Sequence, residues 1–418
     1  MALCHGRSLI QDLSMPWSQY QFGHTLRVLR EIVACLCVLF LCLGGRPFLH
    51  AADEPLVRVT YQSPGQPTSP DTPPLHEEKA VEGRIRVQAV DGGLLVEDRQ
   101  GGLWPITAGQ SPVTETIAPQ YTPLSAEELN AALKAELGEG FEVFPTTHYL
   151  VCTNAGRGYG EWCGRLFERL HAGFQRFWKR RIPNLEVPAQ PLVAIAFATQ
   201  KEFQAFQLAD AGGQVGAAQG YFSARTNRMV LFNQSGEAGP GRALTAAQIQ
   251  KQALRNPMAI ATVIHEAVHQ LSFNMGLQTR YADNPAWFSE GLAMYFETPD
   301  LEAQSGWRTI GKLNTSRLGQ YRKLASVRPL EIRSLIATDD RFRDPASAVD
   351  AYAEAWALHY YLLETQKEKY DNYLKNLGKK QPLQWNTPDQ RVADFEAAFG
   401  ATSDVELALT KYMARRSP

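Results

Sequence analysis

The spacing of apolar residues predicts a small sheet followed by a helical region. The ranges 148–153 and 192–198 are short, nearly uninterrupted apolar runs, which are typical of buried strands. Between them, 159–181 repeats large apolar residues at intervals of three and four, the period of an amphipathic helix. The range 220–232 predicts a hairpin that turns at Thr226-Asn227. Together these elements predict an α+β fold.

Helix start and stop residues delimit further elements. Ser125 and Glu128 form a capping box, which predicts a helix that ends near Leu137. Asn256-Pro257 combines an N-cap with a proline at the first helical position, and Gly276 is a typical stop, so one helix is expected between them. In the C-terminal part, helices are expected over 346–366, 392–399 and 404–415.

The N-terminal third is less regular. A strand-like stretch at 57–61 is followed by the proline-rich run 62–74, which predicts an extended linker. Residues 81–108 alternate and contain two Gly-rich turns, which indicates two or three antiparallel strands. The predicted organisation is a leader (1–52), a proline-rich linker (53–80), a small β unit (81–124), a main lobe (125–300) and its helical C-terminal part (301–418).

Composition and charge narrow the class of protein. The chain has 418 residues, of which 44% are hydrophobic and 20% charged, as in ordinary globular proteins. Its net charge is −1, whereas a general nucleic-acid binder needs a basic surface. No nucleic-acid partner is therefore expected.

The first residues have the order of a signal peptide. Arg27 and Arg30 precede the apolar run 32–43, and the small residues Ala51 and Ala52 follow it. That run is shorter than the roughly 20 residues of a membrane-spanning helix. We expect export to the periplasm, cell envelope or medium with cleavage near Ala51 or Ala52. The alternative is an uncleaved N-terminal anchor, which would hold the protein at a membrane.

The cysteines divide between leader and main lobe. Of the six, four lie in the predicted leader: Cys4, Cys35, Cys37 and Cys42. Cys152 lies on a predicted strand and Cys163 on the following helix. In an exported protein the simplest expectation is a disulfide that joins the two elements, and the alternative is two buried thiols.

One stretch carries metal-binding chemistry. His265 and His269 are four residues apart on the helix expected between Asn256 and Gly276, so both imidazoles lie on one face, about 6 Å apart along the axis. Two histidines at this spacing can bind a single Zn²⁺. Glu266 lies beside them and can act as general base on a metal-activated water. A second predicted helix carries the acid Glu290, which can supply a third ligand.

These residues resemble the gluzincin metallopeptidases. His265-Glu266-x-x-His269 followed by Ser289-Glu290-Gly-Leu-Ala-x-Tyr-x-Glu297 is similar to the paired motifs of thermolysin-like enzymes and zinc aminopeptidases, in a "peptidase MA-like" form. The resemblance covers about residues 145–415, and the two motifs are the part of it that is specific to this superfamily. It implies a zincin-like catalytic domain, Zn²⁺ held by the two histidines and Glu290, Glu266 as base, and a peptide or protein substrate.

Two further residues extend the resemblance. Tyr352 begins a stretch similar to the aminopeptidase helix whose tyrosine stabilises the oxyanion, although Ala355 replaces the glycine of that pattern. The alternative for Tyr352 is an aromatic residue on an amphipathic helix. Other candidates on that helix are His359, Tyr360 and Tyr361. Glu297 is expected either to hydrogen-bond a ligand imidazole or to be a surface carboxylate.

One departure bears on the substrate. Zinc aminopeptidases carry a Gly-x-Met-Glu-Asn segment whose acid binds the free amine, and the comparable stretch 216–222 contains no acid. An endopeptidase is therefore favoured over an aminopeptidase. The alternative from a different class is a non-catalytic, metal-stabilised surface or assembly module. Such a module would need no base beside its metal and would fill the fourth coordination position.

Overall fold

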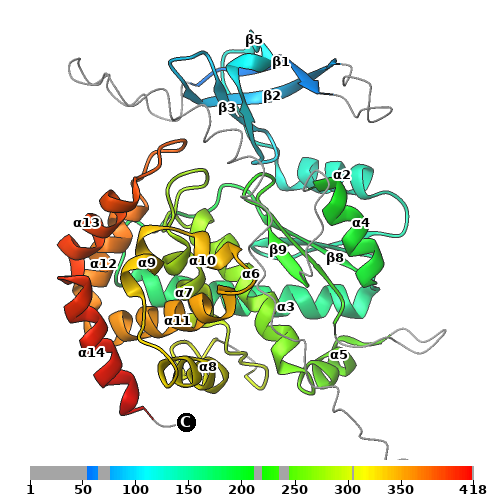
Figure 1. The fold of residues 1–418 in the computed structure, drawn as a ribbon. Helices are drawn as coiled ribbons and strands as arrows, with labels where there is room; N and C mark the ends of the chain where they lie inside the picture. Colours follow the sequence, from blue (N-terminus) through cyan, green and yellow to red (C-terminus); the bar gives the residue numbers. More distant parts are fainter. Residues whose placement is uncertain (1–53, 65–75, 211–218, 235–243, 304–305, 417–418) are drawn as a thin grey trace, which may run out of the picture.

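The structure is a computed structural model that describes residues 54–64, 76–210, 219–234, 244–303 and 306–416. The predicted leader and its four cysteines lie outside these residues. Within them the fold is α+β, as predicted, with two five-stranded sheets and a helical C-terminal half (Figure 1).

An antiparallel sheet forms the N-terminal unit, drawn at the top of Figure 1, with the strand order β4-β3-β2-β1-β5. Its strands are β1 (Leu56–Pro64), β2 (His76–Gln88), β3 (Leu94–Asp98), β4 (Leu103–Ile106) and β5 (Val113–Ala118), with a short 3₁₀ helix η1 (Ala108–Gln110) before β5. The unit has a small core of its own that includes Val59, Val81 and Val96.

The predicted strand at 57–61 is confirmed as part of β1, but the predicted linker is wrong at 62–64 and 76–80, which also belong to strands. β1 pairs antiparallel with β2, with Val57 opposite Gly83 and Ser63 opposite Glu77. The start of β2, residues 77–80, is exposed and mostly charged, so no apolar alternation marks it as a strand. Pairing there depends on backbone hydrogen bonds, which most side chains permit. Residues 65–75 of the proline-rich run lie outside the described residues.

The second sheet has the order β6-β7-β8-β10-β9. Its strands are β6 (Glu142–Pro145), β7 (Tyr149–Thr153), β8 (Leu192–Phe197), β9 (Gly220–Phe222) and β10 (Arg228–Phe232). β7, β8 and β10 run parallel, and the edge strands β6 and β9 are antiparallel to their neighbours. Every residue of β7 and β8 is buried, in agreement with their apolar runs. The predicted hairpin is confirmed, with Asn227 of its turn at φ 61°.

Helices cover both faces of this sheet. On one face lies α3 (Arg157–Lys179), and on the other lie α2 (Ala126–Leu137) and α4 (Gln200–Asp210). Val151 of β7 belongs to the core beneath α3, whereas its neighbour Cys152 belongs to the core beneath α2 and α4. Successive strand residues point to opposite faces, so Cys152 points away from Cys163 of α3. The predicted disulfide is wrong, and both residues are buried free thiols.

The C-terminal half packs helix on helix, and the predicted C-terminal helices are confirmed. The helices are α5 (Ala246–Ala253), α6 (Pro257–Asn274), α7 (Ala286–Phe296), α8 (Thr315–Ala325), α9 (Ile332–Ala337), α10 (Asp340–Arg343), α11 (Ala348–Thr365), α12 (Lys367–Leu377), α13 (Pro388–Phe399) and α14 (Thr402–Ala414). α7 packs against α6 and α11 in one continuous core. α11 approaches α7 closely at Gly291, where an added Cβ atom would lie 2.7 Å from the Cβ of His359.

The N-terminal unit rests on the turn between β9 and β10. Arg280, in the loop after α6, donates to the carbonyl oxygens of Gly101 at 2.9 Å and Ala224 at 3.1 Å, and so joins the two turns. The backbone N–H of Leu103 donates to the carbonyl of Arg225 at 2.7 Å. These contacts fix the small sheet to the hairpin of β9 and β10.

A search of the described residues for a helix of sufficient length and hydropathy to cross a bilayer finds none.

We expect Cys152 and Cys163 to resist iodoacetamide in the folded protein without reductant and to react fully after unfolding. Burial shields both sulfur atoms and raises the pKa of both thiols. Mass spectrometry of peptides alkylated before and after unfolding measures this. A disulfide-linked pair of these peptides would contradict the structure.

Gly291→Ala is expected to lower the free energy of unfolding by about 1–3 kcal/mol, because the new methyl group overlaps His359. Gly319→Ala is the matched control, since its exposed site on α8 has no described atom within 4 Å of the added carbon. It should gain about 0.5–1 kcal/mol, as glycine is unfavourable inside helices. Urea unfolding measures both, and equal effects would rule out the close α7–α11 contact.

Candidate metal centre

Local sequence explains the helix that carries the histidines. α6 begins with Pro257 after the N-cap Asn256, whose side chain accepts a hydrogen bond from the N–H of Ala259. It ends before Gly276, whose φ of 74° suits glycine. His265 and His269 lie one turn apart on its buried face, with ring centroids 4.8 Å apart.

Glu290 on α7 completes a buried group of three. Its Oε2 atom lies 3.0 Å from Nε2 of His265 and 3.6 Å from Nε2 of His269. The potential ligand atoms of the three side chains all lie within 4.8 Å of one another, and all three residues are buried. The structure thus brings together the three residues expected as ligands, and the group can hold a metal ion.

The pKa values of Glu290 and His265 reflect the close approach of Glu290 to the two histidines. Burial alone would raise the pKa of Glu290, but the positive charge and hydrogen bonds of the two histidines hold that pKa well below its usual range. Burial alone would lower the pKa of His265, but hydrogen bonds to Glu290 and Glu297 raise it to about 10. A metal ion has to displace the His265 proton, because only a neutral imidazole nitrogen is a ligand.

Glu297, at the end of α7, supports the first histidine. It is buried, and its Oε2 lies 3.3 Å from Nδ1 of His265. A carboxylate on Nδ1 fixes the imidazole so that Nε2 faces Glu290 and the metal position. The expected hydrogen bond between Glu297 and the imidazole of a candidate ligand, His265, is confirmed, and the alternative of a surface carboxylate is excluded.

Glu266 follows His265 on α6 and is not one of the three candidate ligands, which are His265, His269 and Glu290. The backbone N–H of Phe222, on the edge strand β9, donates to its Oε2 at 3.0 Å. Burial raises the pKa of Glu266, although the two histidines partly offset the rise. A carboxylate with a raised pKa exchanges a proton more readily near neutral pH, as a general base must.

Tyr352 is buried on α11 and packs edge-on against Phe342, with ring centroids 5.2 Å apart. Burial alone would lower the pKa of Arg317, but the charge of Glu297 and, more weakly, an electrostatic interaction with Tyr352 raise it. The role of Tyr352 as oxyanion donor stays a prediction.

The other candidates on α11 have core contacts. His359 is fully buried, accepts or donates a hydrogen bond with the Tyr370 hydroxyl at 2.9 Å, and packs against Gly291. Tyr360 and Tyr361 pack against the ring of Tyr412.

Sequence reasoning missed Asn314 and Arg317, which contact Glu297 from α8. Nδ2 of Asn314 donates to Oε1 of Glu297 at 2.7 Å, and Nε of Arg317 donates to the same oxygen at 3.0 Å. The only signal was the basic character of this part of the chain, which does not single out one arginine.

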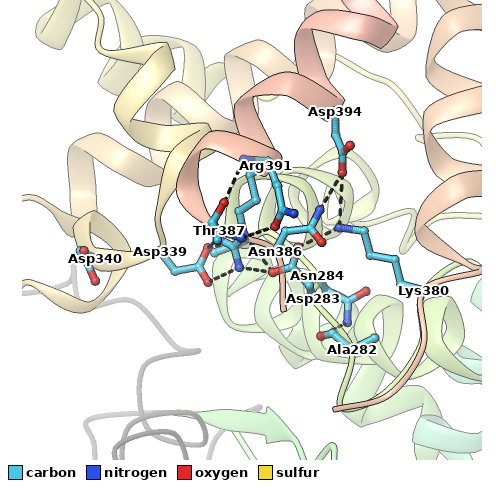
Figure 2. Close-up of polar contacts among 12 residues, drawn as sticks. Ala282, Asp283, Asn284, Asp339, Asp340, Lys380, Asn386, Thr387, Arg391 and Asp394 are labelled. Atoms are coloured by element: carbon cyan, nitrogen blue, oxygen red, sulfur yellow. Dashed lines mark hydrogen bonds and ion pairs between the residues drawn. The ribbon is translucent and has the colours of Figure 1, made fainter. Parts of the chain in front are cut away.

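The start of α7 is held by a buried ionic network (Figure 2). Oδ1 of Asp339 accepts from the backbone N–H of Ala286, the first residue of α7, at 2.9 Å, and from Arg391 at 2.8 Å. Arg391 also donates to Asp283 at 2.9 Å and 2.5 Å, and Lys380 donates to Asp283 at 2.7 Å. Asp283, which precedes α7, thus has its partners on and before α13.

Arg391→Met is expected to lower the free energy of unfolding by about 3–5 kcal/mol, because it leaves the buried carboxylate of Asp283 with Lys380 alone and removes the guanidinium from the partly buried carboxylate of Asp339. Arg343→Met is the matched control, because Arg343 contacts Asp339 and Asp340 only at 3.9 Å and 4.0 Å from a partly exposed position. We expect less than about 1 kcal/mol for this variant. Denaturant unfolding compares them, and similar losses would show that the network does not support the fold.

Comparisons with known proteins bear on part of this region. A family model described as "Protein of unknown function (DUF1570)" matches residues 259–384. That span contains His265, Glu266, His269, Glu290 and Tyr352. A search of curated proteins finds no significant match to the chain. The chain is thus similar to this family over the helices that build the metal centre, and the similarity carries no activity with it.

Proposed function

We propose that the chain is an exported zinc metallopeptidase with a zincin-like catalytic domain, acting on a peptide or protein substrate. The observation that carries this proposal is the position of Glu266. It is a buried carboxylate outside the ligand group yet directly beside it in sequence and space. A purely structural metal site has no use for such a group.

The donor set suits zinc. Two imidazole nitrogens and one carboxylate oxygen are a common ligand set of catalytic zinc, which leaves one position open for water. Ligand atoms of a tetrahedral zinc with bonds near 2 Å lie about 3.3 Å apart. The distances of 3.0 Å and 3.6 Å from Glu290 to His265 and His269 are close to this value.

Three residues of the chain have separate roles in the proposed hydrolysis. When bound, Zn²⁺ supplies Lewis acidity that acidifies water and polarises a carbonyl. Glu266 takes a proton from the attacking water as the oxygen bonds to the scissile carbon, and returns it to the nitrogen as the C–N bond breaks. Phe222 holds one oxygen of Glu266, which leaves Oε1 for this proton. Tyr352 donates a hydrogen bond to the oxyanion.

The edge strand beside Glu266 suits an extended substrate. β9 is an edge of its sheet among the described strands, and an extended peptide can add to such an edge through backbone hydrogen bonds. The stretch 216–222 contains no acid to bind a free amine. Both features favour an endopeptidase over an aminopeptidase.

Glu266→Gln is expected to leave about one zinc per chain bound and to reduce hydrolysis of casein or a peptide library by about 10²–10⁴-fold, since it removes the base and keeps the ligands. Elemental analysis and the digest measure the two effects. Glu128→Gln, at the capping box of α2, is the control and should change neither.

A wild-type chain without stoichiometric zinc, or full activity in Glu266→Gln, would overturn the proposal. Stoichiometric zinc that raises the melting temperature without any hydrolysis would instead support a metal-stabilised module.

A further inference from the structure

We propose that Arg317 is a positioning residue that fixes the His265 imidazole for metal binding through the carboxylate of Glu297. The inference rests on the proposed function only in that a metal binds at His265, His269 and Glu290. It assigns a role to α8, a segment for which the sequence motifs suggest none.

The Glu297 carboxylate is held on both oxygens. Oε1 accepts from Asn314 Nδ2 at 2.7 Å and from Arg317 Nε at 3.0 Å. Oε2 accepts from Arg317 Nη2 at 3.3 Å and lies 3.3 Å from His265 Nδ1. The guanidinium therefore meets both oxygens with two nitrogens, a planar geometry that fixes the orientation of the carboxylate as well as its position.

Arg317 is itself fixed by the start of α8. Oδ1 of Asn314, the N-cap of α8, accepts from the backbone N–H of Arg317 at 3.1 Å, while its Nδ2 contacts Glu297. Behind this first turn, Leu318 and Tyr321 of α8 pack into the main core. The backbone of Arg317 is thus tied to the same carboxylate that its side chain binds.

The role follows from what Glu297 has to do. To hold His265 with Nε2 free for a metal, Glu297 must accept a proton-bearing Nδ1 in one orientation. It does so while buried near a second carboxylate, Glu290, which also contacts His265. A buried carboxylate without a cationic partner is unfavourable, and Arg317 provides that partner.

The test measures zinc affinity by chelator competition, with kcat and KM as a second readout. We expect Arg317→Met to weaken zinc binding about 10–100-fold, the usual effect of losing an outer partner of a metal ligand. Arg317→Lys should recover part of the loss, because lysine keeps the charge but not the planar fork. Glu297→Gln should weaken binding similarly.

Two further measurements distinguish a positioning role of Arg317 from a general loss of stability. Arg181, whose Nη2 lies 2.7 Å from Asp371, has a partly buried side chain that is 16% exposed, and Arg181→Met should leave zinc affinity within about twofold. In a double-mutant cycle, Arg317→Met and Glu297→Gln should be strongly non-additive if Arg317 acts through Glu297.

Unchanged zinc affinity in a folded Arg317→Met variant, or additive effects in the cycle, overturns this proposal alone. If Arg317→Met does not fold, the comparison of Arg317→Lys with wild type decides, and equal affinity overturns it. Zinc binding without peptide hydrolysis overturns the proposed function and leaves this inference standing. A wild-type chain that binds no zinc overturns both.

Discussion

The position of α7 relative to α6 is the constraint on which the candidate metal centre depends. Both histidines lie on α6, so their mutual geometry follows from one helix, whereas Glu290 must be brought to them on another. α7 is held at both ends. At its start Asp339 contacts the backbone of Ala286, and at its end Glu297 contacts His265. Between these ends, the absence of a side chain at Gly291 lets α11 approach closely. Asp339 and α11, which follow α7 in the chain, therefore contribute with α6 to the location of the Glu290 carboxylate.

The residues predicted from the sequence are those whose geometry is local. The spacing of His265 and His269 and the caps of α6 follow from helix periodicity, and Glu290 was found because a short motif surrounds it. Arg317 and Arg391 were not found, because their partners lie far away in sequence and many arginines occur on helices. The disulfide prediction was wrong because strand alternation, rather than sequence proximity, decides which face Cys152 occupies. The polar start of β2 was missed because its pairing needs no apolar residues.

The N-terminal unit and the metal centre meet through one hairpin. β9 supplies the backbone N–H that holds Glu266, and the turn after it contacts both Arg280 and the β3–β4 turn of the small sheet. Arg280 lies in the loop that joins α6 to α7. One set of contacts therefore joins the small sheet, the hairpin and the loop between α6 and α7. A shift of the small sheet would move the turn after β9.

The network around Arg391 has a consequence for the order of assembly during synthesis. A chain made from its N-terminus exposes α6 and α7, with all three ligands, before α8, α11 and α13 exist. At that stage neither Arg391, which pairs with Asp283, nor Asp339, which contacts the backbone at the start of α7, has been made. The three candidate ligands are therefore made early, whereas the contacts that hold α7 form only when α13 docks. If the proposed metal site exists, a chain that ends before α13 carries its ligands without these contacts.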